Sequence, residues 1–223
     1  MRLIIQRPVR GLLSRLKDAA RTAPCSQPTA GCRGLRRAAL LAVFVLGSAQ
    51  AQNLVPNGAF DSDTSGWQLD GAGQLVWSPM DANGAPGSGA AQLTNTSPSS
   101  GFGTGFKRCI PMTSGTAWIL SAKAMVPSGV GQSLLNESRP AYRFYSDTNC
   151  STPIGGPIDF GPGNVAQFDL WQNFGPRLAV APPQAQAIEL RGLISKLVAS
   201  GTPMALFDDY VAVSDTAFLN GFE

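Results

Sequence analysis

One stretch of the chain decides the fold class: Ala117-Trp-Ile-Leu-Ser-Ala-Lys-Ala-Met-Val126. Every second position in it is apolar, namely Trp118, Leu120, Ala122, Ala124 and Val126. The positions between them include Ser121 and Lys123 beside Ile119 and Met125. Successive side chains of a β-strand point to opposite faces, so this alternation predicts a strand with one face on a core and one partly polar face.

The rest of the chain has the same character. Gly and Pro contribute 25 and 17 of the 223 residues, and long amphipathic helix patterns are missing. Short β-rich runs recur between turn signals: Gln74–Trp77, Ala90–Thr94, Gly105–Ile110, Ala141–Ser146, Phe168–Phe174, Ala187–Leu197 and Met204–Val213. Such spacing is typical of an all-β protein, and we expect a single antiparallel β-sandwich over residues 52–214.

The formal net charge of +3 hides a division along the chain. Residues 1–51 carry nine basic side chains and one acidic one, whereas residues 52–223 carry eight basic and thirteen acidic ones. An uncharged apolar run from Ala38 to Ala49 follows Arg37, and Ala49-Gln50-Ala51 follows it. This order predicts a secretory signal peptide cleaved after Ala51. A basic nucleic-acid-binding arm is the alternative, but it leaves the apolar run unexplained.

Export places the protein outside the cell, in the periplasm or on the cell surface. The apolar run is too short for the roughly 20 residues of a membrane-spanning helix, so we expect no membrane insertion of residues 52–223. Their net charge of −5 argues against nucleic-acid binding. Residues 215–223 form a short C-terminal tail.

Two cysteines remain after the leader, Cys109 and Cys150. In an exported protein an isolated pair is most simply a disulfide bridge. A redox or metal-binding pair is the alternative, but the Cys-x-x-Cys spacing is lacking. Histidine is absent from the chain, which excludes Ser–His and Cys–His catalysis and histidine metal ligands.

Several motifs, in order, resemble a known family. The chain after the leader opens with Asn53-Leu-Val-Pro-Asn57-Gly-Ala-Phe60-Asp61 and then Gly66-Trp67. Later come Gly115-Thr-Ala-Trp-Ile-Leu-Ser-Ala122, Trp171-Gln-Asn-Phe174 and, in the last strand, Phe207-Asp-Asp-Tyr-Val-Ala-Val213. This order is similar to that of CenC-like carbohydrate-binding modules of the family 4/9 type. The resemblance implies a galactose-binding-like jelly-roll fold and non-catalytic binding of extracellular polysaccharide or glycan.

The resemblance also implies a structural calcium ion. In the family the ion lies between the acid of the opening motif, here Asp61, and an aspartate of the last strand, here Asp209 or its neighbour Asp208. Asp209 shares parity with Phe207, Val211 and Val213, which we expect to face the core. A buried carboxylate needs a partner, and Ca²⁺ prefers oxygen ligands. A partly solvated Asp209 that caps the strand end is the alternative.

Carbohydrate binding uses flat aromatic faces flanked by polar side chains. On Ala141–Ser146, Arg143 and Tyr145 share one face, which we expect to be exposed. We therefore predict Trp77, Arg143, Tyr145 and Trp171 as ligand-binding residues. For each aromatic ring the alternative is a packed or merely exposed side chain. Trp67 and Trp118 are expected in the core.

Two other functions stay open. The chain could be a free-standing surface or matrix protein that binds other proteins without binding glycans. A glycoside hydrolase would need two placed carboxylates, and no motif joins any two of Glu137, Asp147, Asp159, Asp169 and Glu189. We therefore expect no enzymatic activity.

Overall fold

The computed structural model describes residues 52–129, 131–161, 163–198 and 200–214. The predicted leader (1–51) and tail (215–223) lie outside these ranges. No helix long and apolar enough to span a membrane occurs in the described residues.

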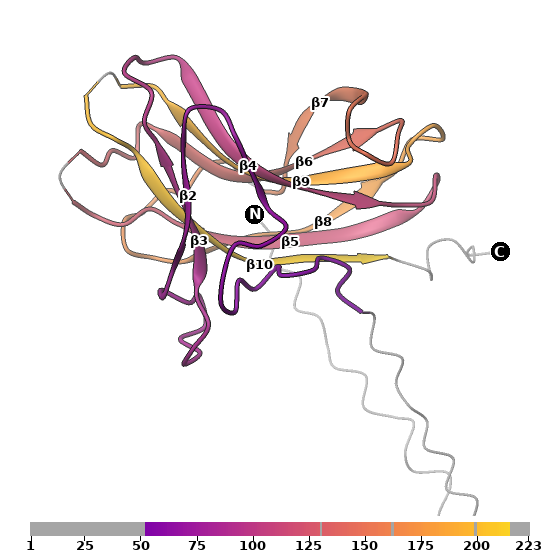
Figure 1. Ribbon diagram of the computed structural model, residues 1–223, viewed down its shortest axis with the longest axis horizontal. Helices are drawn as coiled ribbons and strands as arrows, with labels where there is room; N and C mark the ends of the chain where they lie inside the picture. The colour runs from indigo at the N-terminus through magenta and orange to yellow at the C-terminus, as the bar shows by residue number, and fades with distance from the viewer. Residues whose placement is uncertain (1–51, 130, 162, 199, 215–223) are drawn as a thin grey trace, which may run out of the picture. The chain divides into compact units, whose positions relative to one another are not determined.

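These residues form two five-stranded antiparallel sheets packed face to face and contain no helix (Figure 1). The strands are β1 Gln68–Asp70, β2 Gly73–Ser78, β3 Ala90–Asn95, β4 Phe102–Pro111, β5 Ala117–Met125, β6 Glu137–Tyr145, β7 Pro153–Asp159, β8 Gln172–Val180, β9 Ala187–Lys196 and β10 Met204–Ser214. One sheet, here called the β9 sheet, has the order β1-β4-β9-β6-β7; the other, the β10 sheet, has the order β2-β3-β10-β5-β8. The predicted all-β sandwich is confirmed.

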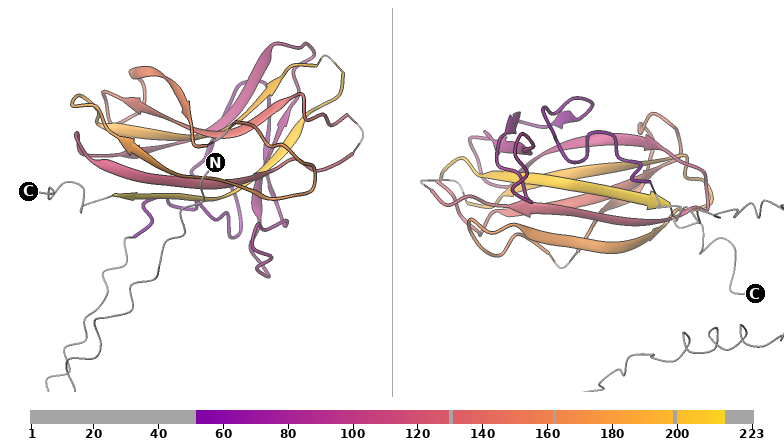
Figure 2. Two further views of the ribbon diagram at one scale, coloured as in Figure 1. Left: turned by 180° about the vertical axis from the view of Figure 1, so that it is seen from behind. Right: turned by 90° about the horizontal axis from the view of Figure 1, so that it is seen from below.

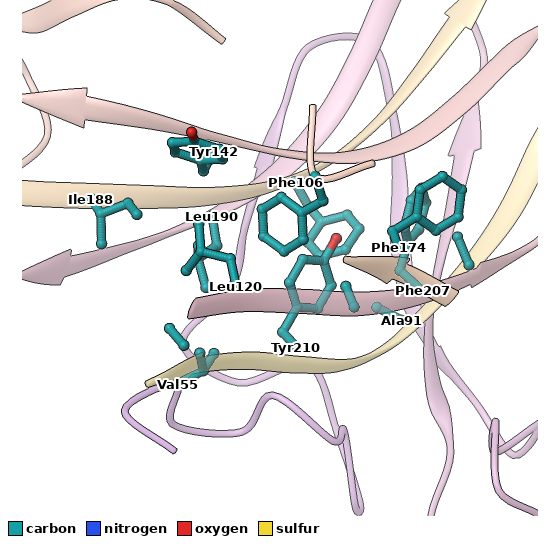
Figure 3. Packing of buried hydrophobic residues seen from close by; sticks show 14 of the residues in the cluster. Val55, Ala91, Phe106, Leu120, Tyr142, Phe174, Ile188, Leu190, Phe207 and Tyr210 are labelled. Atoms are coloured by element: carbon teal, nitrogen blue, oxygen red, sulfur yellow. The ribbon is translucent and has the colours of Figure 1, made fainter. Parts of the chain in front are cut away.

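The core lies between the sheets, and side chains of both meet there (Figure 3). Trp118, Leu120 and Ala122 of β5 point into it, as the alternation predicts. Ile188 and Leu190 of β9 face them from the other sheet.

The opening motif supplies core residues and closes the sandwich. The Trp67 ring lies 5.3 Å from the Phe60 ring and 4.8 Å from the Tyr210 ring. Asn53 binds the last strand, because its Nδ2 donates to Tyr210 O at 3.0 Å and its Oδ1 accepts from Ala212 N at 3.0 Å. The motif therefore has a structural role in this chain.

Two irregularities interrupt the β10 sheet, one on each side of β5. The register between β10 and β5 shifts between Asp208 and Val211, and the register between β5 and β8 shifts between Leu120 and Ala122. Asp209 lies in the shifted segment and has a φ of +49°. A β-bulge of this kind inserts an extra residue and reverses the parity beyond it.

The bulge makes one sequence prediction wrong. Phe207 and Tyr210 point into the core, whereas Asp209, Val211 and Val213 are half-buried and lie outside it. Beyond the bulge the inward positions of β10 are Tyr210 and Ala212, so the parity counted from Phe207 does not hold.

Cys109 and Cys150 form the predicted disulfide, with a Cα–Cα distance of 5.9 Å. The bridge ties β4 to the loop between β6 and β7. The prediction of a strand over Phe168–Phe174 is only partly correct, because β8 begins at Gln172 and runs to Val180.

Candidate functional site

The outer face of the β9 sheet carries a network of polar side chains. They come from positions that alternate with core residues on three neighbouring strands: Lys107 on β4, Glu189 and Arg191 on β9, and Tyr145 on β6. The ladders that join these strands are unbroken, and Glu189 pairs with Cys109 on one side and Arg143 on the other. Regular pairing therefore holds these side chains close together on one surface.

Glu189 is the centre of this network. Its side chain is 1 % exposed, and its Oε1 accepts hydrogen bonds from Tyr145 Oη and Arg191 Nη1, both at 2.9 Å. Lys107 Nζ lies 3.9 Å from the other carboxylate oxygen, Oε2, and 3.7 Å from Asp70 Oδ1. Arg191 also pairs with Asp70. The buried charge is thus compensated by hydrogen bonds and cations, as burial requires.

Tyr145 is a donor to this carboxylate. Burial and the neighbouring charge of Glu189 raise the pKa of the Tyr145 phenol above its usual value. The hydroxyl therefore keeps its proton at neutral pH and can donate it to Glu189.

Two hollows open on this face. One, of about 260 Å³, lies over Glu189 and is lined by Gln68, Lys107, Asn149 and the disulfide. The other, of about 250 Å³, is lined by Asp70, Thr104, Arg191 and Ser195 together with glycines of β4. Lined in this way, both hollows offer hydrogen-bonding groups and charged groups of both signs.

A short loop fixes the rim of the first hollow. The Asp147 carboxylate accepts hydrogen bonds from the backbone amides of Asn149, Ser151 and Thr152. These bonds lower the pKa of Asp147 to about 2. Together with the disulfide at Cys150 they hold Asn149 beside the hollow.

A second polar group lies toward β7. Arg139 pairs with Glu137 at 2.5 Å and with Asp159 at 2.9 Å. Arg143 donates to Gly155 O at 2.8 Å, and its guanidinium lies 5.8 Å from the centre of the Tyr145 ring. Among the described residues Arg143 has no carboxylate within ion-pair distance, so its charge is available to a ligand.

The structure brings together two of the four predicted ligand-binding residues, Arg143 and Tyr145. The prediction that Tyr145 is exposed is wrong, because its side chain is buried against Glu189 and only 4 % exposed. Trp77 belongs to the other sheet, where its Nε1 donates to Phe60 O at 2.7 Å and its ring packs on the core. Trp171 packs against a small apolar cluster of the β10 sheet, formed by Ala90, Met125 and Leu206.

The predicted site residues did not include Lys107, Asp70, Glu189 and Arg191. The available signal was the charged pair Glu189 and Arg191 at alternate positions of an otherwise apolar strand. No exposed aromatic ring lines either hollow in the described part of the chain; the exposed rings there belong to Phe102 and Phe168. Recognition on this face would therefore rely on hydrogen bonds.

The predicted calcium ligands lie around the loop between β2 and β3. Ser88 Oγ lies 3.3 Å from both Asp61 Oδ1 and Ala59 O. Ala82 N donates to Asp208 Oδ2 at 2.9 Å. Asn83 Nδ2 donates to Asp209 Oδ2 at 2.7 Å. The same loop therefore contacts all three carboxylates.

These three carboxylates differ in their surroundings. Asp208 is 0 % exposed, and burial raises its pKa to about 7 although two backbone amides donate to it. Asp209 instead pairs with Lys123 at 2.9 Å. In the described ranges no three acidic, histidine or cysteine side chains converge as a metal site. The oxygens near Asp61 are Ser88 Oγ and Ala59 O, whereas the groups that contact the Asp208 carboxylate are backbone amides of Ala82 and Asp209. Because Ca²⁺ prefers oxygen ligands, these residues fit the ion only if hydroxyl or carbonyl oxygens complete the set.

No protein-family model matches the chain, and no curated protein matches it in sequence. Its structure is similar to a tandem pair of family 22 carbohydrate-binding modules from Paenibacillus barcinonensis, with a TM-score of 0.55 and 12% identity over 74% of this chain and 50% of that one. It is also similar to a family 22 carbohydrate-binding module from Clostridium thermocellum, in which amino acids of a cleft have a role in ligand binding (TM-score 0.50, 13% identity, 73% and 98% covered).

A third similar structure is the enzymatically active domain of tailspike protein 4 of bacteriophage CBA120. There the TM-score is 0.54 and the identity 18%, over 73% of this chain and 21% of that one. Two of these three structures are carbohydrate-binding modules, and the third belongs to an enzyme. The chain therefore has the two-sheet β-sandwich fold of carbohydrate-binding modules, and the likeness implied by its motifs is confirmed at the level of the fold.

Proposed function

We propose that the outer face of the β9 sheet binds glycans without catalysing a reaction on them. One observation carries the proposal: Glu189 lies at the bottom of a polar hollow, with Lys107 beside its second oxygen. A carboxylate next to an ammonium group offers an acceptor and a donor side by side. Neighbouring hydroxyls of a sugar need this combination, and charge-assisted hydrogen bonds of this kind are the stronger ones.

The binding role, as opposed to catalysis, is supported by the pairing of charges on this face. Asp70, Glu137, Asp159 and Glu189 each lie within ion-pair distance of a lysine or arginine. A glycosidase needs one carboxyl group that stays protonated and gives its proton to the leaving group. Cations beside carboxylates favour the ionised form instead.

A glycan array tests this proposal. The full chain should retain a subset of neutral glycans, and Lys107→Met and Asn149→Ala should each weaken retention. Arg177→Met is the matched control, because Arg177 is an exposed cation on β8, in the other sheet. Unchanged retention in both hollow variants would contradict the proposed site, and absence of any glycan binding would contradict the function.

Export is a second part of the proposal. It rests on the basic and apolar pattern of residues 1–51 and on the disulfide, which oxidising compartments favour. Mass spectrometry of the protein recovered from its host should show an N-terminus at Gln52. Recovery of the uncleaved chain in the cytoplasm, with Cys109 and Cys150 reduced, would contradict it.

Calcium binding is a third part. We assign it to Asp61 and Asp208, with Ser88 Oγ and Ala59 O, which lie 3.3 Å apart beside Asp61, as further oxygen ligands. In chelator-treated protein at pH 8, added calcium should raise the melting temperature because it offsets the buried charge of Asp208. Asp208→Asn should abolish this rise, and Asp63→Asn, at an exposed carboxylate of the same N-terminal segment, should keep it. An equal rise in both variants would contradict this assignment.

One alternative function has an observation in its favour. Ile119, Leu178 and Val180 are exposed on the outer face of the β10 sheet. Neighbouring exposed apolar side chains can mark a protein-interaction surface. Concentration-dependent self-association without glycan retention, measured by sedimentation, would support a surface or matrix protein.

A further inference from the structure

A hollow of about 580 Å³ opens on the outer face of the β10 sheet, on the opposite side of the sandwich from Glu189. It lies where both neighbours of β5 are irregular. On one side the β10 register shifts between Asp208 and Val211, and on the other the β8 register shifts between residues paired with Leu120 and Ala122. Bulges are over-represented beside binding and active sites because they re-aim side chains and interrupt pairing.

The backbone at these bulges is held in conformations that ordinary strands avoid. Asp209 has a φ of +49° and Gly175 a φ of +93°. A Cβ atom at Gly175 would lie 2.4 Å from Leu120 O. The hollow is therefore built into the backbone of β5, β8 and β10. These three strands lie side by side in the order β10-β5-β8, with β10 in yellow (Figure 2, right). Left-handed backbone at a non-glycine residue persists only where the surrounding structure enforces it.

The lining of the hollow has two chemical parts. Phe174, Pro176 and Val211 supply apolar surface, while Lys123, Asn173 and Asp209 supply charged and amide groups. Lys123 Nζ lies 2.9 Å from Asp209 Oδ2, and each of these side chains is about a quarter exposed. Asn83 contacts both of them, which fixes the pair. The volume is in the range of small-molecule sites, roughly 300–1,000 Å³.

The charges of the rim limit the class of ligand. Lys123 and Asp209 neutralise each other, so the rim does not favour a ligand with a net charge. It does place donors and acceptors next to one another above an apolar surface. A sugar ring is the neutral ligand class with the matching pattern, one apolar C–H face and adjacent hydroxyls.

We propose that this hollow, lined by residues of β5, β8 and β10, is a second carbohydrate site that takes a single sugar ring. The apolar face of the ring would lie on Pro176 and Val211, with its hydroxyls on Asp209, Lys123 and Asn173. The site shares its ligand class with the proposed function but none of its residues. A chain with both sites could hold two glycans, or two parts of one, on opposite faces.

The test is a titration of the isotope-labelled full chain with methyl β-xylopyranoside and methyl β-galactopyranoside, followed by amide NMR. At least one glycoside should shift the backbone amides of residues 121–123, 173–175, 177 and 209–211. Val211→Trp, which fills the hollow, should abolish these shifts. The matched control is Val213→Trp, which adds the same side chain to the same face of β10 outside the lining and should leave the shifts unchanged.

A milder variant guards against misfolding. Asn173→Ala removes one exposed amide and should weaken binding about fivefold, the effect of losing one hydrogen bond. The proposal is overturned if neither glycoside shifts these amides, or if Val213→Trp abolishes the shifts as Val211→Trp does. Shifts only near Lys107 and Glu189 would overturn the second site and leave the proposed function standing. Shifts only at the β10 hollow would support the second site and contradict the proposed function of the β9 face.

Discussion

The two outer faces of the sandwich differ in regularity and in chemistry. On the β9 sheet, β9 pairs without interruption with β4 and β6, and charged side chains gather into a buried network around Glu189. On the β10 sheet, the ladders are broken on both sides of β5, and the hollow there combines apolar side chains with the ion pair Lys123–Asp209. Regular pairing places polar groups close enough to saturate each other, whereas bulges open space between strands.

The largest expected effect tests how deeply the β9 network is buried. Glu189→Ala removes the partner of Arg191 and of the Tyr145 hydroxyl, and breaking a buried ion pair costs about 3–5 kcal/mol. Chemical denaturation measures the loss. Asp209→Asn, which removes the charge from the partly exposed pair of the other face and keeps a residue type that tolerates positive φ, should cost at most about 1 kcal/mol. Equal losses of unfolding free energy in the two variants would contradict the difference between the two faces.

The disulfide should give the next effect, and it concerns the β9 face alone. Cys109→Ser with Cys150→Ser opens a loop with a sequence separation of 41 residues, which the chain-entropy estimate values at about 4 kcal/mol before native strain is subtracted. Denaturant unfolding measures the change. Because Cys109 and Cys150 line the hollow over Glu189, glycan retention should also fall. If the double variant is fully folded and retains glycans as the unmodified chain does, the loop does not shape the site.

Two glycines at positive φ compare the sheets: Gly175 lies on β8, and Gly155 lies on β7, whose register with β6 shifts between Tyr142 and Phe144. Gly175→Ala and Gly155→Ala both place a side chain at positive φ, which costs roughly 1–2 kcal/mol. A Cβ at Gly155 meets no atom within 4 Å, whereas one at Gly175 meets Leu120 O at 2.4 Å. Gly175→Ala should therefore be at least twice as destabilising in thermal unfolding. A reversed order would mean that the β8 bulge yields easily.

The smallest effect concerns pH. Backbone amides lower the pKa of Asp147 to about 2 from its unfolded value of 3.8. The folded loop then binds fewer protons than the unfolded chain between these values, so its stability is present above pH about 4 and is lost as pH falls toward 2. The protection of the Ser151 and Thr152 amides against exchange, relative to an unfolded chain at the same pH, should fall over this range. In Asp147→Asn this protection should be low at every pH.

For the buried Asp208, in the other sheet, the dependence of stability on pH has the opposite sign. Its folded pKa of about 7 lies above the value of 3.8 for an unfolded aspartate, so the folded protein holds an extra proton between these values. In chelator-treated protein the free energy of unfolding should fall as pH rises from 4 to 7. Asp208→Asn should remove this slope in thermal scans, and a slope that persists in the variant would point to other groups.

The sequence predicted the strands that bury one face against the core. The alternation in β5 and β9 is set by burial of one face, so the positions of Leu120, Ile188 and Leu190 could be predicted. β7 was missed because Pro153, Gly155, Gly156 and Pro157 are turn residues in most contexts. At a sheet edge, where a strand lacks one neighbour, proline is tolerated.

The site was harder to predict, because it depends on which strands become neighbours. Arg143 and Tyr145 were placed on the correct face, but the burial of Tyr145 comes from Glu189 on β9, which is 44 residues away in sequence. Asp209 was assigned to the core because a bulge leaves no mark in a hydrophobic pattern. Trp77 lies in the β10 sheet and Trp171 packs against it, and composition cannot separate a packed ring from a binding surface.

The central claim is that the β9 face around Glu189 binds glycan. The most direct measurement is a titration of the isotope-labelled full chain with β-1,4-linked xylotriose and galactotriose, followed by amide NMR. The account predicts saturable shifts at Lys107, Asn149 and Glu189 with at least one trisaccharide, and their loss in Lys107→Met but not in Arg177→Met. Shifts confined to other parts of the chain, or none with either sugar, would contradict it.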